Sequence, residues 1–115
     1  MSLQNFLFLV SGIEEEFQFI PQNKTFYHGQ DFLRFSCIPP KGNPTPRIHW
    51  TWNGEIVVKS MTNFAVTNYK DPTQTLFYAL EIRRLSSNLA GNLSCVATNV
   101  GGSRHSKFTL TEICK

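Results

Sequence analysis

Apolar and polar residues alternate in short runs along this chain, and the runs recur at roughly ten-residue spacing. A period of two is typical of strands that bury one face, whereas a helical period is nearly absent. Turn-forming residues separate the runs, as expected for a sandwich or a barrel. The pattern therefore predicts an all-β fold, with strands over residues 17–20, 25–27, 33–37, 47–52, 56–59, 64–69, 75–82, 93–97 and 108–110.

Two cysteines and a tryptophan are predicted to face the interior from three separate strands. Period-two counting puts Cys37 on the same face as Leu33 and Phe35, and it also points Trp50 and Cys95 inward. This arrangement fits a disulfide from Cys37 to Cys95 that bridges two sheets with the indole packed against it. Such a bond stabilises the fold by about 4 kcal/mol in the chain-entropy model. Two buried free thiols, as found in a reducing compartment, are the alternative.

Glycine, proline and asparagine mark where the chain is expected to turn. Asn53-Gly54 predicts a tight hairpin, because both central positions of a type I′ turn need positive φ. Prolines between residues 39 and 46 predict a stiff irregular connection, since each one fixes φ and restricts the residue before it. Pro21 lacks an amide donor and is expected to end the first run.

At these positions the chain resembles the intermediate, or I-set, class of immunoglobulin-like domains. Such domains occur in neural adhesion molecules, receptor tyrosine kinases, receptor phosphatases and giant muscle proteins. The resemblance runs from about Phe17 to Leu110. Each of its motifs is weak alone, but together, in this order and spacing, they are specific. The motifs are Gly42-Asn43-Pro44-Thr45-Pro46, Ile48, Trp50, Asn53-Gly54, Leu80, Ile82, Leu85 and Cys95-x-Ala97-x-Asn99-x-x-Gly102. It implies a Greek-key β-sandwich of two antiparallel sheets over residues 17–113, with residues 1–16 as an N-terminal extension or linker.

One departure from the family pattern concerns the turn before the second cysteine. The family has D-x-G-x-Y-x-C here, whereas this chain has Leu89-Ala90-Gly91-Asn92-Leu93-Ser94-Cys95. The hydroxyl of the corner tyrosine is therefore missing, and a hydrogen bond of that kind is worth about 0.5–1.5 kcal/mol. We expect Leu93 to fill the tyrosine's pocket.

Size and charge limit the classes of function. With 115 residues, 41% of them hydrophobic and 17% charged, the chain is expected to form one core unaided. Its net charge is +3, and its basic residues are scattered too thinly to favour nucleic-acid binding. No run approaches the ~20 apolar residues of a membrane-spanning helix, the longest being Phe6 to Val10.

The first dozen residues, Met1 to Gly12, fit a secretion signal poorly. They lack a positive start, and their apolar core is too short. Met1-Ser2-Leu3 is interpreted as an expression-derived start, followed by a linker or a short extra strand. A genuine signal peptide is the alternative.

Candidate catalytic and metal-ligating groups are sparse. His28, His49 and His105 stand apart from cysteine pairs and from acidic residues at ligand spacing, so no metal site is expected. Glu14-Glu15-Glu16 is interpreted as a solvated linker, because adjacent residues on an extended segment point in opposite directions. No motif of nucleophilic catalysis or phosphate binding occurs. We therefore expect neither an enzyme nor a bound cofactor.

Two N-x-[ST] sequons, at Asn23 and Asn92, are candidate N-glycosylation sites and give modest support for secretion. Asn92 is predicted to face outward from its strand. Cys114 has no partner in the predicted disulfide pairing. We expect a neighbouring domain of a larger protein to cover or pair Cys114, the alternatives being an intermolecular bond or a free thiol.

The leading functional hypothesis is a non-enzymatic binding and spacing module of an extracellular receptor or adhesion protein. Its partners would be another protein, of the same or a different kind, and neighbouring domains of the same chain. The alternative is a structural domain of an intracellular muscle or cytoskeletal protein. The predicted contact face is the outer side of one sheet, with the loop over residues 99–103 as an equal candidate. The residues of that face are His49, Thr51, Val96, Thr98, Lys107 and Thr109.

Overall fold

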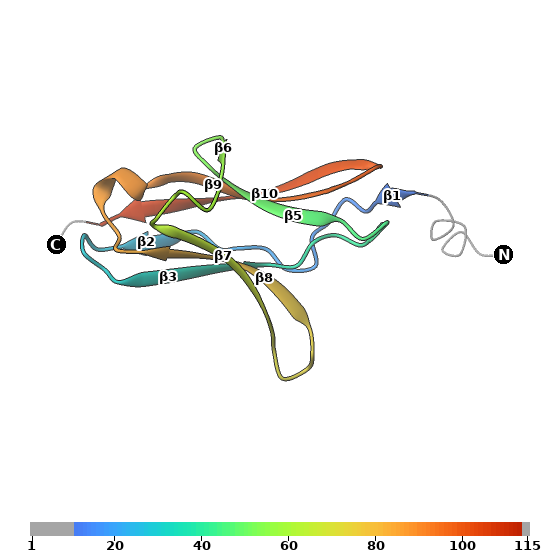
Figure 1. The fold of residues 1–115 in the computed structure, drawn as a ribbon, viewed down its shortest axis with the longest axis horizontal. Coiled ribbons are helices and arrows are strands. Elements are labelled where there is room, and N and C mark those ends of the chain that lie inside the picture. The colour runs from blue at the N-terminus through green and yellow to red at the C-terminus, as the bar shows by residue number, and fades with distance from the viewer. Residues whose placement is uncertain (1–10, 114–115) are drawn as a thin grey trace.

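The strands form two sheets packed face to face in the computed structural model, which describes residues 11–113 (Figure 1). The larger sheet has the order β2-β10-β9-β5-β6 and the smaller one the order β3-β8-β7, while β1 and β4 pair at one end of the sandwich. Within this part of the chain the pairings are antiparallel except that of β2 with β10, which is parallel. The predicted all-β sandwich is confirmed.

From the N-terminus the strands are β1 (Gly12–Ile13), β2 (Lys24–Phe26), β3 (Phe32–Cys37), β4 (Gly42–Asn43), β5 (Arg47–Trp52), β6 (Glu55–Ile56), β7 (Phe64–Lys70), β8 (Leu76–Arg83), β9 (Gly91–Asn99) and β10 (Gly102–Glu112). A turn of 3₁₀-helix over Ser87–Leu89 lies between β8 and β9.

Side chains from the inner faces of both sheets fill the space between them. Trp50 of β5 is 1% exposed, and its ring meets that of Phe108 of β10 edge-on, with 6.0 Å between centroids. Phe35 of β3 packs on the other side of the core against Phe108 at 4.6 Å. Leu80 and Ile82 of β8 are completely buried. Burying side chains of this size stabilises a fold by about 1.5–3 kcal/mol each, so these positions determine which face of each strand turns inward.

A disulfide joins Cys37 at the end of β3 to Cys95 in β9 and so links the two sheets. Both cysteines are fully buried, and their Cα atoms lie 6.6 Å apart. Trp50 is the cross-strand partner of Cys95 in the pairing of β5 with β9. The indole therefore lies beside the bond that crosses the core.

Two of the expected strands are shorter than the alternation predicted. Over residues 17–20 only Phe19 pairs, in an isolated bridge with Ile38. The pairing does not extend further because Pro21 and Pro39, which follow the two paired segments, supply no amide donor. The strand expected over residues 56–59 is reduced to β6: the Val57 amide still donates to the carbonyl of Trp50 at 2.9 Å, but the chain then turns between Val58 and Met61 instead of continuing beside β5. Alternation indicates which residues could pair, whereas the partner's amides determine how far pairing extends.

β1 lies inside the segment that was predicted to be an N-terminal extension or linker. It pairs with β4, with Gly12 opposite Asn43. The interpretations of residues 1–10 and of Cys114 concern positions outside the described residues.

The turn before the second cysteine is held by a tryptophan in place of the family's tyrosine. The indole Nε1 of Trp52 donates a hydrogen bond to the carbonyl of Leu89, at 3.0 Å. Leu93 is 2% exposed, as expected of a side chain that fills the tyrosine's pocket. Trp52 also packs against Phe64 of the smaller sheet, with 5.6 Å between ring centroids.

The predicted hairpin at Asn53-Gly54 is present, with φ of 48° and 85° at its two central residues. The side-chain Oδ1 of Asn53 accepts a hydrogen bond from the backbone amide of Asn92, at 3.0 Å. Gly91 lies directly beneath this side chain, where a Cβ would come within 2.2 Å of the same oxygen. Glycine is therefore the residue that lets the hairpin and β9 approach so closely.

β7 and β8 extend away from the sandwich as a projecting hairpin (Figure 1). At its tip one oxygen of Asp71 accepts hydrogen bonds from the Thr73 hydroxyl at 2.6 Å, the Thr73 amide at 2.9 Å and the Thr75 amide at 3.0 Å. The Thr73 hydroxyl, followed by the Thr75 amide, lowers the pKa of the Asp71 carboxyl below its usual 3.8, because these donors favour the charged form.

Candidate functional site

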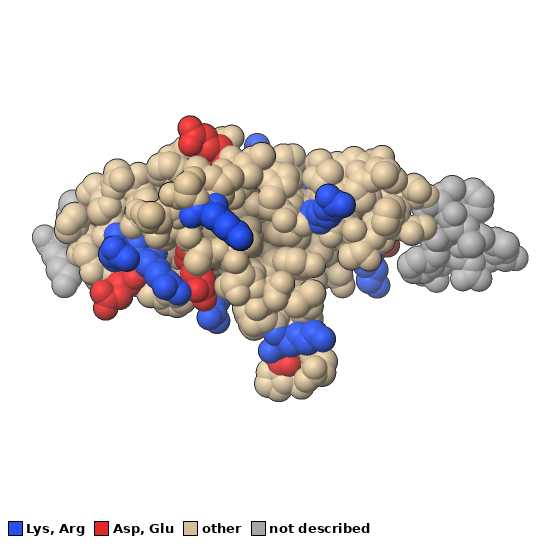
Figure 2. Space-filling model, viewed as in Figure 1, with Lys and Arg blue, Asp and Glu red and all other residues tan. Residues whose placement is uncertain are grey.

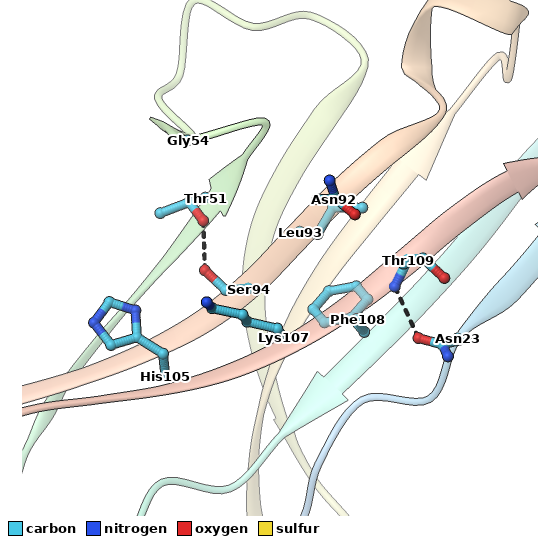
Figure 3. A pocket seen from close by; sticks show the side chains of 10 residues that line it. All are labelled: Asn23, Thr51, Gly54, Asn92, Leu93, Ser94, His105, Lys107, Phe108 and Thr109. Carbon is cyan, nitrogen blue, oxygen red and sulfur yellow. Dashed lines mark hydrogen bonds between the residues drawn. The ribbon is translucent and has the colours of Figure 1, made fainter.

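An open hollow of about 600 Å³ lies on the outer face of the larger sheet (Figure 3). Side chains from neighbouring strands and from the segment before β2 surround it. Its lining residues are Asn23, Thr51, Gly54, Asn92, Leu93, Ser94, His105, Lys107, Phe108 and Thr109.

Hydroxyl, amide and ammonium groups supply the polar part of the hollow's lining, beside carbon atoms that include those of Leu93 and Phe108. The hydroxyls of Thr51 on β5 and Ser94 on β9 hydrogen-bond to each other and fix each other's position (Figure 3). Lys107 of β10 lies beside them and is exposed. The hollow thus offers two hydroxyls held by their mutual hydrogen bond and an exposed ammonium group, all of which a polar contact can use.

Both sequon asparagines reach this hollow although they lie far apart in the sequence. The amide of Thr109 donates to Oδ1 of Asn23 at 2.8 Å, and Thr109 is also the cross-strand partner of Asn92 (Figure 3). Asn23 and Asn92 therefore flank β10 from its two sides, about 10 Å apart at the backbone. Both asparagines are exposed, so glycans attached to them would cover the same area.

Only some residues of the predicted contact face lie together at the hollow. Thr51, Lys107 and Thr109 line the hollow, whereas His49 and Thr98 lie outside its lining and are half-buried. Val96 was expected to be part of an exposed surface but is 2% exposed. Its strand is central in the sheet, and the longer side chains of His49 and of His105 flank it in register. Val96 therefore offers almost no contact area.

The other predicted contact site, the loop between β9 and β10, is exposed at its tip and anchored at its base. Val100 is 77% exposed. Asn99 donates from Nδ2 to the carbonyls of Gly12 at 2.6 Å and Pro44 at 2.9 Å. Arg104 donates from Nη2 to the carbonyl of Ile13 at 3.0 Å. The base of this loop thus holds the segment by which the chain enters the sandwich.

Charge and ligand type do not single out any other site among residues 11–113. That part of the chain contains no group of three or more histidine, cysteine or acidic residues placed to hold a metal ion. Figure 2 shows basic and acidic side chains mixed over the visible face, without a continuous field of one sign. No helix of the described residues is long and apolar enough to cross a bilayer.

The sequence model of the immunoglobulin I-set domain matches residues 15–111, which include both sheets and the disulfide between them. The chain belongs to the immunoglobulin I-set family. Members of this family are protein-interaction modules and are generally not catalytic, which agrees with the polar but chemically unspecialised hollow of this I-set domain.

Curated relatives of the I-set domain are much longer proteins. It is 28% identical over 104 residues to Roundabout homolog 4 of Mus musculus, a match that covers 90% of this chain and 9% of the relative. It is 44% identical over 64 residues to the muscle M-line assembly protein unc-89 of Caenorhabditis elegans, covering 56% of this chain and 1% of the relative. The I-set domain thus spans at most about a tenth of the relatives it matches.

Solved structures share its fold. Titin domain M7 has a TM-score of 0.72 at 21% identity, with 91% of this chain and 98% of that chain covered. The N-terminal Ig1-2 module of the Drosophila receptor protein tyrosine phosphatase DLAR has a TM-score of 0.70 at 28% identity, with 85% of this chain and 48% of that one covered.

Sequence reasoning missed a set of exposed aromatic residues on the smaller sheet. Phe32 at the start of β3 is 42% exposed, and Phe19 beside the sheet is 45% exposed. Phe32 precedes the predicted alternation of residues 33–37 directly and occupies an outward position, which is the signal that could have revealed it. The I-set domain therefore has two outer faces of different character, one polar and one aromatic.

Proposed function

We propose that this I-set domain is a non-enzymatic contact and spacing module of a larger cell-surface receptor or adhesion protein. The observation that carries the proposal is the bond between Cys37 and Cys95, because disulfides persist in oxidising compartments and are rare in the cytosol. The two exposed sequon asparagines, Asn23 and Asn92, add support. A relative described as a receptor, the DLAR phosphatase, has domains of this fold.

The proposed partners are a protein, of the same or a different kind, and the neighbouring domains of the same chain. On the larger sheet the contact would use the polar groups around Thr51, Lys107 and Thr109, and at the end of the sandwich it would use the loop over residues 99–103. Glycans on Asn23 and Asn92 would cover the hollow between these groups, so glycosylation moves the proposed contact away from it.

A structural domain of an intracellular muscle protein is the second candidate. The match to the muscle M-line assembly protein unc-89, at 44% identity, supports it. In a reducing cytosol the two cysteines would remain buried thiols, and the same core would persist without the bond.

The redox state of the cysteines separates the two candidates. Full-length protein from the cells that make it is treated with a thiol-alkylating reagent without reduction, and labelled peptides are identified by mass. We expect Cys37 and Cys95 to stay unlabelled until a reductant is added. Labelling of both cysteines before reduction, in protein unfolded to expose them, rules out the cell-surface proposal.

Glycosylation provides a second test of compartment. Intact mass is measured before and after enzymatic deglycosylation of the protein from the same cells. We expect a loss of mass that Asn23→Gln reduces, with Asn92 modified less completely because β9 pairs on both sides. An unchanged mass favours the muscle candidate.

A further inference from the structure

Four aromatic rings and an arginine form a continuous stripe across the outer face of the smaller sheet. The Arg34 guanidinium lies over the Phe32 ring at 5.9 Å and over the Tyr69 ring at 5.0 Å. Tyr69 stacks on Phe77 at 5.2 Å, and Phe77 meets Phe19 edge-on at 5.3 Å. We call Phe32, Arg34, Tyr69, Phe77 and Phe19 the aromatic stripe.

The aromatic stripe remains accessible despite these internal contacts. Phe19 and Phe32 are close to half exposed, at 45% and 42%, and the Arg34 side chain is 45% exposed. Exposed aromatic side chains next to arginine are the composition that protein interfaces concentrate at their centres. Tyr69 and Phe77 between them are partly buried, so the stripe presents two accessible rings that are joined by partly covered ones. A contiguous exposed patch of this kind is typical of an interaction site.

The stripe carries an excess of positive charge at one end. Glu81 is 9% exposed, and one of its oxygens accepts hydrogen bonds from Nε and Nη2 of Arg34 at 3.2 and 2.9 Å. Its other oxygen is 3.4 Å from Nη2 of Arg83, the cross-strand partner of Phe32. Two guanidinium groups thus share one carboxylate. One positive charge and several N–H donors remain for a group outside the domain.

We propose that the aromatic stripe docks a partner protein segment in which a carboxylate side chain lies next to aromatic or aliphatic side chains. The carboxylate binds Arg83 and Arg34, and the apolar groups cover Phe32 and the rings toward Phe19. This inference deepens the proposed contact role and is independent of the compartment. A second copy of this chain is a poor occupant, because two such stripes would bring like charges together.

The position of the sequons is consistent with this assignment. Asn23 and Asn92 line the hollow on the outer face of the larger sheet, whereas the aromatic stripe lies on the smaller sheet. A glycan at Asn92 would therefore leave the stripe uncovered.

The test uses the 115-residue chain and a phage-displayed library of random linear peptides. We expect enriched peptides to carry Asp or Glu close to Phe, Tyr, Trp or Leu. An enriched peptide, made synthetically and added to isotope-labelled chain, is expected to shift backbone amide signals of β3, β7 and β8. Arg83→Glu is expected to weaken its binding by about tenfold or more, and selection against Arg83→Glu is expected to enrich basic peptides instead.

Matched variants make the result specific. Arg47→Glu makes the same change of charge at an exposed arginine of β5 in the larger sheet and is expected to leave peptide binding unchanged. Phe32→Ala removes an exposed ring and is expected to weaken binding without a change of charge; it replaces Arg83→Glu as the test if the latter unfolds. Denaturant midpoints identify any variant that does not fold.

Four outcomes would overturn the assignment: no enrichment, enrichment without acidic residues, amide shifts confined to β9 and β10, or unchanged binding in both Arg83→Glu and Phe32→Ala. The assignment would also be overturned if the chain self-associates and Phe32→Ala abolishes this self-association. The occupant of the stripe would then be a second copy of the chain and not an acidic segment. Thiol labelling and deglycosylation test the cell-surface proposal separately, so either proposal can fail while the other stands.

Discussion

Trp50 shows that a single buried residue can stabilise the core while leaving a polar group unpaired. Its indole is 1% exposed, and its Nε1 has no hydrogen-bond partner among the described residues. An unpaired buried donor costs about 1–3 kcal/mol. The contacts with Phe108 and the neighbouring disulfide more than offset this cost, since burying a large aromatic side chain removes 150–250 Å² from water by general estimate, on the order of several kcal/mol.

The disulfide beside Trp50 is expected to contribute a large share of the stability. Replacing Cys37 by alanine should lower the free energy of unfolding of secreted protein by ~2–5 kcal/mol, because the unfolded chain regains the freedom that the cross-link removes. Urea unfolding measures the loss. The double variant Cys37→Ala/Cys95→Ala is the control and should lose little more than the single one. A loss below about 1 kcal/mol would mean that the bond contributes little.

Trp52 is expected to stabilise the turn before β9. In Trp52→Phe the carbonyl of Leu89 loses its donor, and the free energy of unfolding should fall by about 1–3 kcal/mol. Backbone amide shifts in the Ser87–Leu89 turn should change most. Unchanged shifts in this turn would show that the indole does not hold it.

Among the strands, β7 and β8 form a hairpin whose base is part of the core, with Leu80 and Ile82 buried, and whose tip is supported by little else of the fold. The hairpin projects from the sandwich, and β7 is an edge strand of the smaller sheet (Figure 1). Its tip therefore depends on local contacts, chiefly those that Asp71 accepts from Thr73 and Thr75. Tyr69 and Phe77 of the aromatic stripe are cross-strand partners directly behind this tip, whereas Phe64 and Ile82 pair at the root of the hairpin.

Acid should loosen the hairpin tip before it affects the sandwich. The pKa of Asp71 is lower in the folded chain than the 3.8 of a free side chain, so its contribution is fully present above 3.8 and is lost as pH falls through the lower folded value. The Thr73 and Thr75 amides report this loss in a titration followed by magnetic resonance. Asp71→Asn is the control and should remove the pH dependence. A folded pKa of Asp71 at or above 3.8 would contradict the expectation.

At the scale of the whole molecule, alternation predicted the inner faces well and the outer faces poorly. Trp50 and Leu93 are buried as expected, because a period of two fixes which side chains turn toward the partner sheet. The same period of two predicts that Val96 is exposed, whereas it is buried. Periodicity contains no information about the side chains on neighbouring strands that cover a residue of a central strand.

Features that depend on which strands are neighbours were beyond the reach of local patterns. The approach of Asn23 to Asn92 requires the parallel pairing of β2 with β10, and the aromatic stripe requires that residues from Phe19 to Phe77 meet on one face. Neither set has a characteristic spacing in the sequence. Both follow from the order of strands in the two sheets.

The entry of the chain into the sandwich should depend on Arg104. Its Nη2 bonds the carbonyl of Ile13, next to Glu14, whose amide donates to the carbonyl of Lys41 at 2.8 Å. In Arg104→Met this Glu14 amide should exchange with solvent about tenfold faster, because local opening becomes easier. Arg47→Met, an exposed arginine on β5, is the matched control. Equal exchange rates in the two variants would show that Arg104 does not hold this segment.

The chain enters the sandwich beside β1 and leaves it past the far end of β10 (Figure 1). β10 has eleven residues and by itself spans about 37 Å. Gly12 and Glu112, near the two ends of the described residues, are thus held apart by about the length of this strand. Because Asn99 and Arg104 hydrogen-bond the carbonyls of Gly12 and Ile13, a pull on the chain at Gly12 would load the β9–β10 hairpin through these bonds.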